Sequence, residues 1–86
     1  MTRTEIENKM KEIIAVQFGI RIDEVELDLN FVKDLNADSL DAVEMVMMTE
    51  DHFDIRIEDE EADRFFTVGG VVDFVEKKIN DKSSKY

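Results

Sequence analysis

The sequence of 86 residues contains no cysteine, no proline and no tryptophan, and it has only one histidine and three glycines. Without cysteine the chain forms neither disulfides nor a thiolate metal site, so any thiol chemistry requires a thiol that a cofactor supplies. The absence of proline and the low glycine content favour helices over sheets. With a single histidine, the chain also has few groups that could activate a nucleophile near neutral pH.

Long hydrophobic runs are missing too. No apolar run approaches the roughly 18 residues that cross a bilayer, and the first ten residues, MTRTEIENKM, are too polar for a secretory signal. We therefore expect a cytoplasmic protein that does not enter membranes, or an organellar one whose transit segment has been removed. An apolar content of 43% in a chain of this length predicts one globular domain with a modest core.

The charge is strongly negative, at −11, and it is unevenly distributed. Between residues 38 and 63 a single base, Arg56, stands among eleven acids. These acids are Asp38, Asp41, Glu44, Glu50, Asp51, Asp54, Glu58, Asp59, Glu60, Glu61 and Asp63. Such a field repels nucleic acid and anionic membranes and attracts basic partners. A surface that only aids solubility is the alternative, but the charge gathers around Ser39, which favours a functional role.

Hydrophobic spacing predicts an all-α fold: a small four-helix bundle of three longer helices and one short helix, with a long loop between the first and second. The helices are expected over residues 4–17, 38–53, 59–64 and, after a cap at Thr67, 68–80. The expected domain spans residues 1–80, and residues 81–86 form a polar tail that is expected to fray. Seven apolar residues of the loop are candidates to anchor it to the core: Ile22, Val25, Leu27, Leu29, Phe31, Val32 and Leu35.

The second predicted helix is apolar on two sides when its residues are placed at roughly 100° intervals. One side is an ordinary core face made of Ala42, Met45, Val46, Thr49 and Phe53. The other side has an apolar seam of Leu40, Val43 and Met47, flanked by Glu44, Glu50 and Asp51. Because unpaired carboxylates are rarely buried, we expect the seam to be exposed and to serve a partner. Packing of the seam under the long loop is the alternative.

Ser39 lies at the start of this helix, in the stretch LNADSLDAVEMVMM. Asp38 is a strong N-cap, and Asp41 three residues later gives a variant of the capping box. The first turn of a helix favours a phosphate group because its amides are free and its dipole is positive there. His52 is about 20 Å away along the helix axis, which excludes a Ser-His-acid triad. Another enzyme must therefore modify Ser39.

These residues carry a family resemblance. Asp38-Ser39-Leu40, followed by residues 41–44 (Asp-Ala-Val-Glu), resembles the attachment motif of acyl carrier proteins. The similarity extends through Phe53-Asp54, Ile57 and residues 59–62 to Thr67-Val68. The resemblance implies a free-standing carrier for fatty acid synthesis, with a 4'-phosphopantetheine arm that holo-acyl-carrier-protein synthase transfers from coenzyme A to Ser39. The thiol of the arm would hold growing acyl chains as thioesters and deliver them to fatty acid synthesis enzymes.

The resemblance also implies a role for each matching position. Ser39 and Asp38 belong to the attachment site. The face that basic partner enzymes bind comprises Leu40, Asp41, Val43, Glu44, Met47, Glu50 and Asp51. The pocket that shelters the acyl chain comprises Phe31, Val32, Met45, Thr49, Ala62, Phe65 and Val71. No catalytic residue and no specific metal site are expected, and the carrier is expected to work as a monomer.

Five residues depart from the family pattern. Asn36 stands where glycine is common, and asparagine is well suited to a left-handed backbone. Glu58 replaces a common proline, which is expected to loosen the start of the short helix. Phe65 and Phe66 are bulky for an acyl pocket, and Thr49 is polar for one. We expect the ring of Phe65 to shorten the chain that fits.

Three other functions are consistent with parts of the sequence. A specialised carrier of aminoacyl, peptidyl or polyketide chains would use the same serine. An acidic, non-enzymatic interaction module would use only the apolar seam. A calcium loop beginning at Asp34 matches at Asn36 and Asp38, but it has Ser39 where glycine is required and Met45 where a bidentate glutamate is required.

Overall fold

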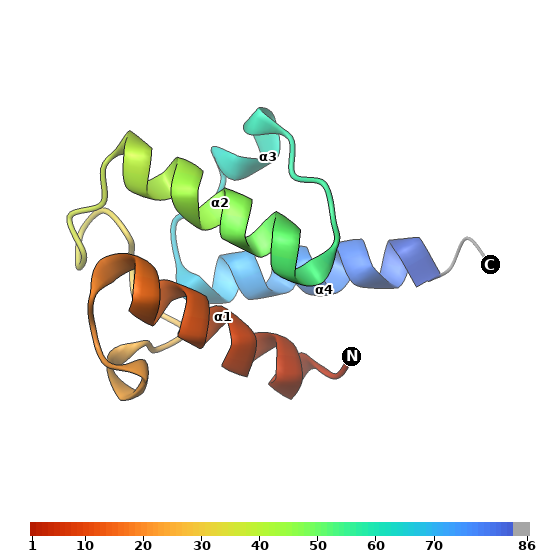
Figure 1. The fold of residues 1–86 in the computed structure, drawn as a ribbon, viewed down its shortest axis with the longest axis horizontal. Coiled ribbons are helices and arrows are strands. Elements are labelled where there is room, and N and C mark those ends of the chain that lie inside the picture. Colours follow the sequence, from red (N-terminus) through yellow and green to blue (C-terminus); the bar gives the residue numbers. More distant parts are fainter. Residues whose placement is uncertain (84–86) are drawn as a thin grey trace.

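The computed structural model describes residues 1–83, which form a small all-α bundle (Figure 1). Its helices are α1 (Arg3–Phe18), α2 (Ser39–Phe53), the short α3 (Asp59–Ala62) and α4 (Val68–Ser83), and a 3-10 turn, η1 (Ile22–Glu24), follows α1. Within the described residues there is no strand, and the single isolated bridge joins Asn30 to Thr67. The predicted fold class is confirmed.

The ends of α1 show how side chains set its length. Thr2 caps the helix: its hydroxyl accepts a hydrogen bond from the Glu5 amide at 3.2 Å, and its own amide donates to the Glu5 carboxylate at 3.0 Å. The bond from the Thr2 amide holds the pKa of Glu5 below its ordinary value. Gly19 ends the helix with a φ of 66°, a left-handed conformation that glycine adopts without strain. The helix therefore begins one residue before the predicted start at Thr4.

The hydrophobic core lies around α1, which packs against both α4 and α2 (Figure 1). One side of α1 is buried at Ile6, Met10, Ile13 and Ile14. Helix α4 contributes four fully buried residues, Val68, Val71, Val72 and Val75. From α2 only Met45, Thr49 and Phe53 are buried. Ala42, placed on the core face by its spacing, is exposed and lines an open cavity beside α2 instead.

The long loop between α1 and α2 is attached to the start of α4 by backbone hydrogen bonds. The Gly69 amide donates to the Leu27 carbonyl at 2.8 Å, and the Val68 amide donates to the Leu29 carbonyl at 3.1 Å. A Cβ on residue 69 would lie 3.1 Å from that Leu27 oxygen, so the close approach favours glycine. Val25 and Phe31 anchor the loop as predicted, whereas Ile22 and Val32 are 52% and 61% exposed, and their prediction as anchors was wrong.

The C-terminal helix is longer than predicted. It continues to Ser83, so residues 81–83 are helical where a frayed tail was expected from residue 81. The remainder of the predicted tail, residues 84–86, lies outside the described residues.

The α1 stripe generates the first prediction. Ile14 is 0% exposed, so Ile14→Ala removes packed methyl groups and should lower the free energy of unfolding by about 2–5 kcal/mol. Val16 lies two residues away on the same helix but is 74% exposed, and Val16→Ala should change stability by less than about 0.5 kcal/mol. Urea denaturation of both variants checks this, and equal losses would show that α1 does not pack as described.

Candidate functional site

The start of α2 is defined by a reciprocal pair of hydrogen bonds. The Asp38 carboxylate accepts from the Asp41 amide at 3.0 Å, and the Asp38 amide donates to the Asp41 carboxylate at 3.2 Å. The predicted capping box is confirmed. Asn36, two residues earlier, has a φ of 53°. This is the left-handed conformation that was expected here, where an asparagine stands in place of a common glycine. Together these features place Ser39 as the first residue of the helix.

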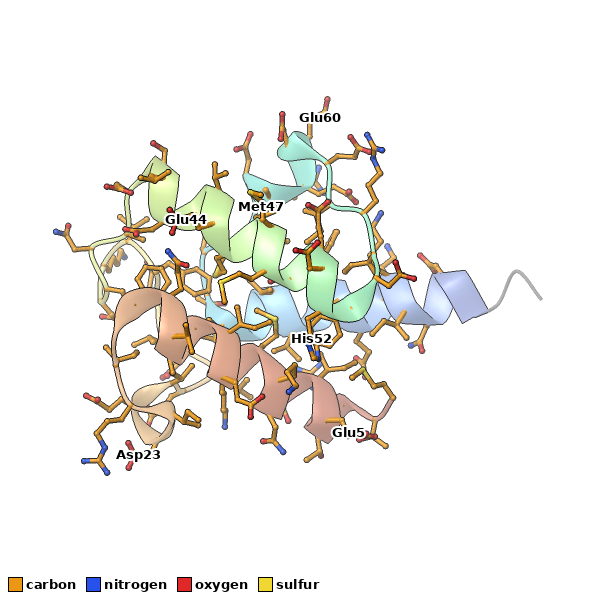
Figure 2. All side chains as sticks on the ribbon, viewed as in Figure 1. Glu5, Asp23, Glu44, Met47, His52 and Glu60 are labelled. Atoms are coloured by element: carbon orange, nitrogen blue, oxygen red, sulfur yellow. The ribbon has the colours of Figure 1, made fainter. Side chains whose placement is uncertain are left out.

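The Ser39 side chain is exposed, and it has no hydrogen-bond partner among residues 1–83. His52 lies near the other end of α2, where its ring packs edge-on against Phe53 at a centroid distance of 4.9 Å (Figure 2). The two residues are thirteen positions apart in the sequence, so the histidine is about 20 Å from the serine along the helix axis. The site therefore offers an accessible hydroxyl group but no histidine positioned to activate it.

The apolar seam is exposed along α2, as predicted. Leu40, Val43 and Met47 are 63%, 54% and 58% exposed, so the loop does not cover them. Figure 2 shows Glu44 and Met47 on α2, on the side of the helix that the viewer sees. The seam thus forms a narrow apolar strip among carboxylates.

The carboxylates beside the seam are not equivalent. Glu44 accepts a hydrogen bond from the Gln17 side chain of α1 at 2.7 Å and remains exposed. Glu50 is half-buried, and its carboxylate accepts the backbone amide of Ile57 at 2.8 Å. Asp51 is exposed on the same helix. One of the acids assigned to partner binding therefore also holds the segment between α2 and α3.

An open cavity of about 660 Å³ lies beside α2 and includes Asp38 and Ser39 in its wall. Five of the predicted pocket residues line it: Phe31, Val32, Met45, Ala62 and Phe65. The other two do not. Val71 is fully buried in the core, and the Thr49 hydroxyl donates to the Met45 carbonyl at 2.8 Å, which satisfies it inside the core.

Several wall residues of the cavity had not been predicted. Phe18, just beyond the predicted end of the first helix, stacks on Phe31 with ring centroids 6.1 Å apart. Ile57 also lines the cavity, as does Phe66, which the departures from the family pattern had already marked as bulky for such a pocket. Two residues of the apolar seam, Val43 and Met47, also line this cavity. Helical spacing gives no signal for Phe66 or Ile57, because both lie between helices.

Phe65 stands between two cavities. Its half-buried ring lines the 660 Å³ cavity and also a smaller one of about 350 Å³ beside α4. The ring packs edge-on against Phe74 of α4 at a centroid distance of 5.1 Å. This contact holds the ring at the border that the two cavities share.

Glu58 does not loosen the start of α3, contrary to the expectation from the missing proline. Its amide donates to the Glu61 carboxylate at 3.0 Å, a bond that a proline could not make. This bond is the main reason that the pKa of Glu61 lies below its ordinary value, and the nearby Lys78 adds to the shift.

The carboxylates of the proposed calcium loop have other partners. Asp34 accepts the Asn30 amide at 2.8 Å, and Asp38 caps α2. Among residues 1–83 no group of three histidine, cysteine, aspartate or glutamate side chains is placed to hold a metal ion.

Comparison with known proteins identifies the family. Residues 8–75 match the protein family described as "Phosphopantetheine attachment site". The chain is 47% identical over 77 residues to the acyl carrier protein of Akkermansia muciniphila, covering 90% of this chain and 96% of that protein. Its structure also resembles that of the acyl carrier protein from Enterococcus faecalis, with a TM-score of 0.77 and 42% identity over 91% of this chain and 99% of the other.

The chain belongs to the acyl carrier protein family. The predicted carrier function and its cofactor, 4'-phosphopantetheine, are thereby confirmed. The thiol of the arm supplies the thioester chemistry that a chain without cysteine lacks.

The residues around Ser39 fit this prosthetic group. The hydroxyl is free, it occupies the first turn of a 15-residue helix whose dipole favours a phosphate, and the wall beside it is mostly apolar. Asp38 and Asp41 bring negative charge close by, but both carboxylates are engaged by backbone amides of the capping box.

The capping box generates the second prediction. Asp38→Ala removes the acceptor of the Asp41 amide and should lower the free energy of unfolding by about 1 kcal/mol. Asp38→Asn retains an oxygen acceptor and should lose much less stability. Ser39→Ala is the neighbouring control, because the serine hydroxyl makes no hydrogen bond within residues 1–83. Denaturant unfolding measures all three; a stable Asp38→Ala variant would contradict the capping role.

Proposed function

We propose that Ser39 is the residue to which 4'-phosphopantetheine is attached. One observation carries this proposal: Ser39 presents an unbonded, exposed hydroxyl in the first turn of α2, in the wall of the cavity. The substrate of the modification is coenzyme A, and the modifying enzyme is a holo-acyl-carrier-protein synthase. Catalysis resides in that enzyme and in the later acyl-transfer enzymes, because this chain offers only the anchor for the arm.

The exposed side of α2 is the docking face for these enzymes. Leu40, Val43 and Met47 offer a narrow apolar contact, and the acids around them, including Asp41, Glu44 and Asp51, attract a basic patch. Charge of this kind raises the rate of encounter more than the final affinity. A small contact area then lets the carrier leave each enzyme after one reaction.

The cavity shelters the acyl chain. Its wall contains the aromatic rings of Phe18, Phe31 and Phe65 together with Met45, which suit an alkyl chain better than an aminoacyl or peptidyl group. This favours a fatty-acid-synthesis carrier over a specialised one.

A monomeric, cytoplasmic carrier agrees with the available observations. None of the helices within residues 1–83 has the length and apolar content that crossing a membrane requires. The apolar strip on α2 is narrow and bordered by acids of one sign, so two copies placed face to face would repel each other.

The attachment site is tested by intact mass. Incubation with coenzyme A, Mg²⁺ and a broad-specificity phosphopantetheinyl transferase should add one phosphopantetheinyl group to the wild type and none to Ser39→Ala. A gain of the same mass by Ser39→Ala would place the attachment elsewhere. No gain by folded wild type would favour the acidic interaction module.

The docking face is tested by reversing one charge. Glu44→Lys should slow phosphopantetheinyl transfer at low salt, and the difference from wild type should shrink as salt screens the field. Glu26→Lys makes the same change of charge at an exposed loop position and is the matched control. Equal rates for the two variants, or a wild-type rate independent of salt, would contradict steering by α2.

The role of Phe65 is tested by removing its ring. Phe65→Ala should join the two cavities that the ring borders, and it should stabilise the protein loaded with long acyl chains relative to the wild type. An acetyl-loaded form is the control, because so short a chain does not reach the ring. The melting temperatures of the long-chain and acetyl-loaded forms are measured for the variant and for the wild type. If the difference in melting temperature between the two loaded forms is the same in both proteins, Phe65 does not limit the cavity.

A further inference from the structure

The smaller cavity lies between α3 and α4, and Ser39 is not in its wall. It has a volume of about 350 Å³ and follows α4 from Gly70 to Asp81, which is about 16 Å along the helix axis. Phe65 and Phe74 form its apolar part, with their rings packed edge to face at 5.1 Å. The proposed function assigns no ligand to this cavity.

Cations gather in the wall of this cavity, although the chain as a whole has a net charge of −11. Arg64, Lys77 and Lys78 all line it. Two carboxylates line it as well, those of Glu61 and Asp81, and Glu61 is already paired with Lys78 at 3.2 Å. Three cations against two carboxylates make this wall locally positive, in contrast to the acidic surface of α2.

Two of these cations have no partner. Arg64 and Lys77 are exposed, and neither makes a hydrogen bond or an ion pair within residues 1–83. The pKa of Glu61 is lowered mainly by the Glu58 amide and to a smaller extent by the charge of Arg64. The guanidinium therefore lies near that carboxylate without pairing with it. Both cations are free to pair with an anion that enters the cavity.

We propose that this cavity is a second ligand site, which binds an alkyl chain that ends in an anionic group. Arg64 and Lys77 pair with the anion. The chain lies against the rings of Phe65 and Phe74, toward Gly70. A free medium-chain fatty acid has this chemistry, and so has an alkyl phosphate. The inference goes beyond the proposed function, because the ligand is not attached to the arm.

The size and the chemistry of the cavity together select this class of ligand. A volume of about 350 Å³ is at the small end of ligand cavities and suits a chain of medium length. Lys77 follows Gly70 by seven residues on α4, so the cationic end and the apolar end are about 10 Å apart. The anion gains charge-assisted hydrogen bonds at one end, and the chain gains apolar contact along the rest. In a cavity this open, both contributions are needed.

The ligand is related chemically to the cargo of the carrier. Hydrolysis of an acyl thioester by water yields the thiol and the free carboxylic acid, so reactions that unload a carrier by hydrolysis release a molecule of this class. A free acid bound between α3 and α4 leaves the docking face on α2 open to the next enzyme.

NMR titration of the apo protein with octanoate tests the site. The amide signals of Gly70 and Lys77 should shift and saturate, with a dissociation constant on the order of 1 mM for a ligand of about ten non-hydrogen atoms. Octan-1-ol has the same chain without the charge and should bind about fivefold more weakly. Equal binding of the alcohol, or shifts confined to Phe31 and Met45 of the larger cavity, would overturn the proposal.

Two variants of equal net charge test the cations. Arg64→Gln combined with Lys77→Gln should weaken octanoate binding about fivefold, as expected for the loss of two exposed ion pairs. Lys11→Gln combined with Lys33→Gln removes the same charge outside the cavity, at lysines that make no ion pair within residues 1–83, and should leave binding unchanged. None of the four side chains holds the fold by a hydrogen bond, so both proteins should fold. An equal loss in both would show that only net charge matters and would overturn the site.

The chain and the anionic group are tested with a series of ligands. From butanoate to octanoate the affinity should rise about two- to fourfold for each added methylene, because the chain is withdrawn from water. A flat series would overturn the contact with Phe65 and Phe74. Octyl phosphate separates the two sources of this chemistry: tighter binding of octanoate supports a fatty acid, and tighter binding of the phosphate supports an alkyl phosphate. No measurement in the set involves the arm, so the result is independent of attachment at Ser39.

Discussion

The second helix has two apolar sides, and a bundle of this size buries only one of them. Met45, Thr49 and Phe53 pack toward α1, which leaves Leu40, Val43 and Met47 in water. The remaining arrangement depends on that division. In the proposed function, one helix provides the anchor at its first residue, the docking strip on its outer side and part of the cavity wall, so the prosthetic arm would start where both surfaces meet.

The acids of this region look alike in the sequence but act through different contacts. Asp38 and Asp41 fix the start of α2 by binding each other's amides, and Glu61 binds the Glu58 amide at the start of α3. Glu50 holds the segment that follows α2. Glu44 and Asp51 remain exposed and are available to a basic partner. Part of the negative charge of this region therefore comes from acids whose contacts fix the local backbone conformation.

Local pattern predicted the three long helices well, because each has a clear apolar period and a recognisable cap. The exposed seam of α2 followed from spacing alone. The loop was harder to predict: Ile22 and Val32 are as apolar as Val25, and their burial depends on how the loop folds onto the bundle, which has no periodic signal in the sequence. The Glu50–Ile57 bond and the place of Phe66 in the cavity wall depend on how α3 returns across α2, for which the sequence has no periodic signal.

Side-chain methyl groups provide the most direct measurement of the central claim that the inner side of α2 shelters the chain. Met45 lines the cavity and is 2% exposed, whereas Leu40 of the apolar seam is 63% exposed and does not line the cavity. Met10 lies in the core, 3.8 Å from the Thr49 hydroxyl. In methyl NMR spectra recorded before and after octanoyl loading, we expect the largest shift at Met45 and none at Met10. A shift at Leu40 with none at Met45 would place the chain on the apolar seam and contradict the claim.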